Sequence, residues 1–95
     1  MNTHARDAAE TLALQALGWL ASQDELFPVF VGSTGVYAAD LAQRAGEAEF
    51  LASVLDFILL DDRWVLDFCA AAGLQPDQPM RARLALPGGA SQDWA

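Results

Sequence analysis

The chain has 95 residues, of which 54% are apolar and 19% are charged, with five arginines, no lysine and thirteen acidic residues. This length predicts one domain, and the apolar content is too high for a disordered chain. The net charge of −8 argues against nucleic acid and an anionic membrane surface as partners, because both are negatively charged. No uncharged stretch reaches the roughly 20 apolar residues that a membrane-crossing helix needs.

The number of cysteines and the N-terminal residues indicate the cellular compartment of the protein. Cys69 is the single cysteine, so no internal disulfide can form, which fits a reducing cytosol. Arg6, Asp7 and Glu10 precede the first apolar run and do not resemble the basic start of a signal peptide. We therefore expect a cytoplasmic protein.

Two helices are predicted in the first third of the chain. The first runs from about Ala5 to Ala21, with an apolar stripe at helical spacing and a capping box formed by Asp7 and Glu10. The second begins at a capping box of Ser22 and Glu25. Pro28 then lies past the first turn and is expected to bend that helix, which ends at Gly35 in a left-handed conformation.

The middle of the chain predicts a short helix followed by a central one. Ala38 to Ala45 carries alanine and leucine at i, i+3, i+4 and i+7 and ends at Gly46. The next helix, residues 47–60, is apolar around most of its circumference except for a polar line of Glu49, Ser53 and Asp56. A helix of that kind belongs at the centre of a bundle.

Two further helices complete the predicted domain. Asp61 and Asp62 suit the N-terminus of a helix that stops at Gly73. A last helix begins within the segment Pro76 to Pro79 and ends near Leu86. The predicted fold is all-α, a compact bundle of five to six short helices over residues 1–89, with a flexible C-terminal tail at residues 90–95.

An offset of 38 residues superposes the apolar pattern of the chain on itself. It places the first helix on the fourth, Phe30 on Phe68, and Gly35 on Gly73. Such an echo is expected from a bundle with rough twofold pseudo-symmetry. The alternative is that any two pairs of amphipathic helices give a similar echo.

We find no catalytic constellation in the sequence. His4 is the single histidine, and a zinc site needs three or four suitable ligands. The acidic residues lack the spacing of a calcium loop and are explained by helix capping and solvated faces. We therefore expect no metal, no cofactor and no enzymatic activity.

Five residues are candidates for a functional role. Asp56 interrupts the most apolar segment of the chain, and a buried carboxylate there would need Arg63 or Arg44 as a partner. The candidates for partner binding are Trp64, Arg81, Arg83 and Trp94. Arg81 and Arg83 form the only basic pair, and Trp94 is a large apolar side chain in a polar tail.

Several segments together resemble a known bacterial family. They include Val54-Leu55-Asp56-Phe57, Phe68 to Leu74, and Leu86-Pro87-Gly88-Gly89. On these segments the chain is similar, over about residues 10–89, to domain of unknown function family 3572 (DUF3572). The resemblance implies a small cytoplasmic helical protein of bacteria. That family has no assigned activity or site, so the resemblance carries no functional residue over to this chain.

Three functions follow from these observations. The first is a small non-enzymatic interaction or regulatory module that binds another protein. The second is a small ligand-binding protein or enzyme that uses a pocket at a buried Asp56. The third is a structural protein that pairs with a second copy of itself, as a homodimer.

Overall fold

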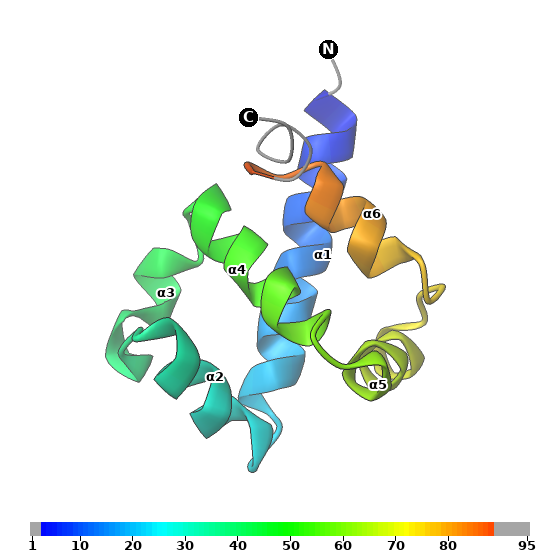
Figure 1. The fold of residues 1–95 in the computed structure, drawn as a ribbon. Helices are drawn as coiled ribbons and strands as arrows, with labels where there is room; N and C mark the ends of the chain where they lie inside the picture. The colour runs from blue at the N-terminus through cyan, green and yellow to red at the C-terminus, as the bar shows by residue number, and fades with distance from the viewer. Residues whose placement is uncertain (1–2, 89–95) are drawn as a thin grey trace.

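The protein is described by a computed structural model that covers residues 3–88, and these residues form an all-α compact bundle (Figure 1). No strand occurs in this part of the chain. The α-helices are α1 (Thr3–Ala21), α2 (Leu26–Thr34), α3 (Leu41–Arg44), α4 (Ala48–Ile58), α5 (Asp62–Ala72) and α6 (Gln78–Leu84). A 3₁₀ helix, Ala38–Asp40, precedes α3.

The core forms where α1 and α4 pack against each other, with α6 packing on both. The fourth helix is central, as predicted, because it buries apolar side chains on most of its surface. The buried side chains of α4 are Phe50, Leu51, Ala52, Val54, Leu55, Phe57 and Ile58. Those of α1 are Ala9, Leu12, Ala13, Ala16, Leu17 and Leu20.

The starts of α1 and α2 differ from the prediction. Asp7 lies inside α1 rather than at its start, and Glu10 pairs with Arg6 instead of closing a capping box. Ser22 does not cap α2: its hydroxyl donates to the Trp19 carbonyl at the end of α1. Because α2 starts at Leu26, Pro28 falls in its first turn, where the missing N–H has no helical partner to lose.

The third and fourth helices are shorter than predicted. The segment over 38–45 divides into the 3₁₀ helix and α3, and neither buries a residue fully. Leu60 lies beyond the end of α4 and is 76% exposed. It therefore does not extend the apolar surface of α4 into the core, as the prediction of a helix over 47–60 required.

The helix ends in the second half follow the sequence closely. Asp61 is the N-cap of α5, and its carboxylate accepts the backbone N–H of Arg63 at 2.8 Å. That bond and the Arg63 side chain hold the pKa of Asp61 below its ordinary value. Pro79 lies in the first turn of α6, as expected. The predicted tail at residues 90–95 lies outside the described part of the chain.

Some features of the two halves correspond across the 38-residue offset, although α6 packs on α1 and α4 and its counterpart α3 packs on neither in the same way. Figure 1 shows α2 and α3 on one side of the crossing of α1 and α4, and α5 and α6 on the other. Gly35 closes α2 at φ +72°, with its N–H on the carbonyl of Val31. Gly73 closes α5 at φ +71°, with its N–H on the carbonyl of Cys69, 38 residues later.

Two aromatic contacts between the halves also correspond under the 38-residue offset. Phe30 of α2 meets Phe57 of α4 at a centroid distance of 5.3 Å. Phe68 of α5 meets Trp19 of α1 at 5.9 Å. A shift of 38 residues converts each contact into the other with the halves exchanged.

Candidate functional site

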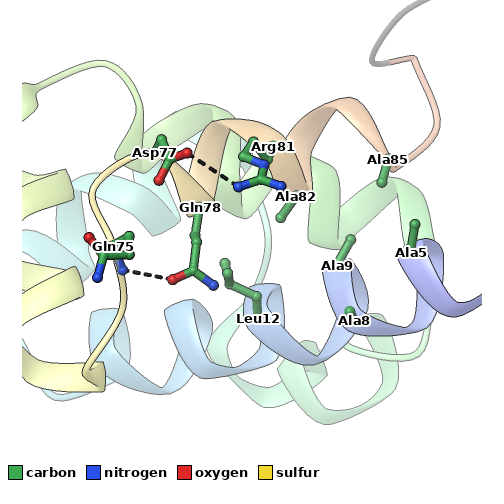
Figure 2. A pocket seen from close by; sticks show the side chains of 10 residues that line it. All are labelled: Ala5, Ala8, Ala9, Leu12, Gln75, Asp77, Gln78, Arg81, Ala82 and Ala85. Carbon is green, nitrogen blue, oxygen red and sulfur yellow. Dashed lines mark hydrogen bonds and ion pairs between the residues drawn. The ribbon is translucent and has the colours of Figure 1, made fainter.

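A half-open groove of about 390 Å³ lies between α1 and α6. Figure 2 shows the side chains that line it, with α1 forming one wall and α6 with its preceding loop the other. The lining residues from α1 are Ala5, Ala8, Ala9 and Leu12. The others are Gln75, Asp77, Gln78, Arg81, Ala82 and Ala85.

Alanines form most of the apolar lining of the groove. Residues 5, 8, 9 and 12 share one face of α1, because three and four positions make about one helical turn. Ala82 and Ala85 are likewise three positions apart at the end of α6. Ala9 and Ala82 are buried where the two helices meet, whereas Ala8 is exposed, so the groove opens beside this contact.

One end of the groove is polar. Asp77 accepts from Nη1 of Arg81 at 3.3 Å, and the Gln78 side-chain oxygen accepts the backbone N–H of Gln75 at 2.7 Å (Figure 2). Both members of the ion pair are largely exposed. The groove therefore joins an apolar wall of alanines to a charged, hydrated end.

Asp56 does not form the buried polar site that the sequence suggested. Its side chain is 58% exposed, and it pairs with Arg83 at 2.6 Å rather than with Arg63 or Arg44. The expectation fails because Asp56 sits on the polar line of α4, which α6 covers only in part. It does not line the groove between α1 and α6.

Arg81 and Arg83 do not form one basic patch. Two positions along a helix rotate a side chain by about 200°, so the two arginines leave α6 on opposite faces. Arg81 reaches the groove. The side chain of Arg83 is only 12% exposed and also donates to the Pro87 carbonyl at 3.0 Å.

The two tryptophan candidates have different places. Trp64 of α5 is half-buried and stacks on Phe57, with ring centroids 5.0 Å apart and planes inclined by 17°. It is not among the groove residues. Trp94 lies outside the described residues.

The remaining reactive side chains in the described chain are isolated. His4 lies exposed on α1, and no group of three or more His, Cys, Asp or Glu residues between 3 and 88 is placed to hold a metal ion. Cys69 is buried, with its thiol 3.4 Å from the Gln75 carbonyl. Burial, and secondarily the charge of Asp77, raises the pKa of this thiol. No helix in the same part of the chain is long and apolar enough to cross a membrane.

Sequence reasoning identified one groove residue, Arg81, and missed the rest. The signal that exists is the alanine spacing on the first and last helices. Alanine at that spacing equally well predicts two helices in close contact. The groove becomes visible only when the separation of α1 and α6 is known.

The family described as protein of unknown function (DUF3572) matches residues 6–89, and the chain belongs to that family. The match includes every groove residue except Ala5 and stops before the predicted tail. A comparison with curated proteins gave no match, and a comparison with solved structures gave none either.

Proposed function

We propose that this member of the DUF3572 family is a non-enzymatic interaction module whose groove between α1 and α6 binds a short segment of another protein. The observation that carries the proposal is the groove itself, with alanine walls and one charged end. At about 390 Å³ it is near the lower end of ligand-site volumes. That volume suits one or two apolar side chains of a partner rather than a whole helix.

Charge favours a basic partner. Each of the five arginines pairs with a different carboxylate, on Glu10, Glu47, Asp61, Asp77 and Asp56. Seven other carboxylates in the described chain have no arginine partner, and all seven residues are exposed, so they are open to an incoming cation. A segment with an apolar anchor and flanking lysines or arginines would match both the groove and its surroundings.

Cytoplasmic action is part of this proposal. It is supported by the single cysteine, which is buried and unpaired with any other thiol in the chain. A homodimer would use the same groove for a second copy of the chain. An enzyme at Asp56 has no support, because that carboxylate is exposed and lies away from the groove.

The test is to fill the groove without changing the fold. Ala8 is exposed on α1 and lines the groove, so Ala8→Leu adds a large side chain there and keeps a good helix former. Ala70→Leu is the matched control, because Ala70 is an exposed alanine on α5 outside the groove. Circular dichroism should give the same helix content for both variants.

Each tagged variant is incubated with native cell lysate, and retained proteins are identified by mass spectrometry. We expect one stoichiometric partner, retained by the wild type and Ala70→Leu, at least about tenfold depleted with Ala8→Leu, and released by salt. Equal retention by Ala8→Leu and Ala70→Leu would refute binding in the groove. Capture of only the protein's own untagged copy would replace the proposal with self-association.

A further inference from the structure

We propose that the partner segment in the groove between α1 and α6 is extended, and that two side chains recognise it. Gln78 donates to one of its main-chain carbonyls, and Asp77 pairs with a lysine or arginine beside its apolar anchor. This inference rests on the proposed function and deepens it, because it assigns the residues that select the occupant of that groove.

The side chain of Gln78 is held in one orientation. Its oxygen accepts the backbone N–H of Gln75 at 2.7 Å, which is the bond that a capping-box glutamine makes. The backbone N–H of Gln78 donates in turn to the Gln75 carbonyl at 3.0 Å. Because a backbone N–H bonds to the oxygen of a side-chain amide, the Gln75 bond also fixes which atom is the nitrogen. That nitrogen lies on the Leu12 side of the amide, within the groove (Figure 2).

The amide nitrogen of Gln78 is a donor that the fold leaves available. It carries two N–H groups, and neither has an acceptor among residues 3–88. Gln78 is half-buried in the groove wall, so a segment that fills the groove removes water from this amide. The segment must then supply an acceptor, because an unpaired donor that loses its water is costly.

A main-chain carbonyl is the acceptor that every peptide segment carries. In a helix the carbonyls are bonded within the helix, whereas in an extended chain they are free to accept from Gln78. The occupant is therefore extended rather than helical. This agrees with the volume of the groove, about 390 Å³, which suits side chains of a segment and not a whole helix.

Asp77 supplies the charge preference at the same end of the groove. Its carboxylate accepts from Arg81 at 3.3 Å, and the side chains of Arg81 and Asp77 are 74% and 65% exposed. An exposed pair of this kind is worth little, so a cation of the partner can bind Asp77 beside Arg81 or in its place. Since Asp77 precedes Gln78 directly, that cation is a close neighbour in sequence of the carbonyl that Gln78 binds.

The probe is a tripeptide, Arg-Leu-Arg, with an acetylated N-terminus and an amidated C-terminus, titrated into the ¹⁵N-labelled full-length protein. A tripeptide is too short to form a helix. We expect a dissociation constant on the order of millimolar, with shifts of the Gln78 side-chain N–H signals and of the backbone amides of Ala8, Ala9 and Ala82. Arg-Ala-Arg, which has the same charge without the anchor, should bind about tenfold more weakly.

Two variants separate the hydrogen bond from the charge. Gln78→Glu keeps the oxygen that accepts from Gln75 but replaces the amide donors with a negative charge. In salt of about 0.5 M, where the Debye length is about 4 Å, we expect it to bind Arg-Leu-Arg about three- to tenfold more weakly. Charge attraction alone would make it bind more tightly. At low salt, Asp77→Asn should weaken binding about threefold. Asp67→Asn, which removes the same charge from an exposed position on α5, should leave binding nearly unchanged.

Three results would overturn the inference. The first is the absence of groove shifts with Arg-Leu-Arg at millimolar concentration. The second is equal or tighter binding by Gln78→Glu, and the third is equal binding by Asp77→Asn and Asp67→Asn. None of these is failure of the proposed function, which is equal capture of a partner by Ala8→Leu and Ala70→Leu. If Ala8→Leu loses the partner and Gln78→Glu keeps it, the groove binds the partner through other contacts.

Discussion

Arg83 is predicted to stabilise the fold far more than its partner Asp56 does. Its Nε–H donates to Asp56 at 2.6 Å and its Nη1 to the Pro87 carbonyl at 3.0 Å. These bonds join α6 to α4 across 27 positions of sequence and hold the chain where it leaves α6. The Arg83 side chain is 12% exposed, whereas that of Asp56 is 58% exposed.

The two ends of this pair should differ in energy for that reason. Arg83→Met keeps the apolar stem but removes both hydrogen bonds. A hydrogen bond with a charged donor contributes about 1.5–3 kcal/mol to stability, and hydration of the freed acceptors offsets part of that loss. We expect a net loss of about 2–3 kcal/mol in the free energy of unfolding. Asp56→Asn should cost at most about 1 kcal/mol, because an exposed charge is well hydrated in either state.

Urea unfolding followed by circular dichroism at 222 nm measures both losses, provided the slope m is unchanged. Arg6→Met is the control, because Arg6 makes an exposed ion pair with Glu10 on one helix and should cost no more than about 0.5 kcal/mol. If Asp56→Asn costs as much as Arg83→Met, the ion pair rather than the Pro87 bond carries the energy. A loss below about 0.5 kcal/mol for Arg83→Met would refute the reasoning entirely.

Three further predictions concern single positions. Gly73→Ala should lower the free energy of unfolding by about 1 kcal/mol, because Gly73 has φ +71° although a Cβ has open space there. Gly18→Ala within α1, where a Cβ also has open space, should raise the free energy of unfolding by about 0.5–1 kcal/mol. Urea titrations in which both variants change stability in the same direction would contradict this. The lowered pKa of Asp61 means that its ionised cap stabilises the fold above the unfolded-state pKa and is lost as the pH falls through the folded-state pKa. Thermal melts of Asp61→Ala should therefore show a deficit at neutral pH that narrows in acid, and a deficit constant with pH would argue against the cap. The buried thiol of Cys69, with its raised pKa, should react with a disulfide reagent much more slowly in the native protein than in urea, and equal rates would show that the α5–α6 corner opens freely.

Local patterns predicted well wherever the deciding contacts are close in sequence. Asp61 caps α5 through a backbone N–H two residues away, and Gly35 and Gly73 end their helices through bonds four residues back. The same reasoning failed at Ser22, where two local bonds compete. Its hydroxyl satisfies the last turn of α1 instead of the first turn of α2, and a capping-box pattern does not distinguish the two.

The candidate site was less predictable. The sequence predicts Arg81 and Arg83 as one basic pair, but only Arg81 lines the groove, and the side chain of Arg83 is largely buried. The sequence predicts Arg63 or Arg44 as the partner of Asp56, because these arginines are near in sequence. The actual partner lies 27 positions away, and no local pattern encodes such a distance.

The sequence by itself determined the helical class, the central helix, and the left-handed stops at Gly35 and Gly73. Each of these depends on apolar periodicity or on groups within one helical turn of each other. Only the tertiary structure decided which arginine meets Asp56 and where the contact between α1 and α6 opens into a groove. Those outcomes depend on the rotation and separation of helices that α1 and α6 adopt only when packed, because side-chain length along the whole interface sets how closely two helices approach.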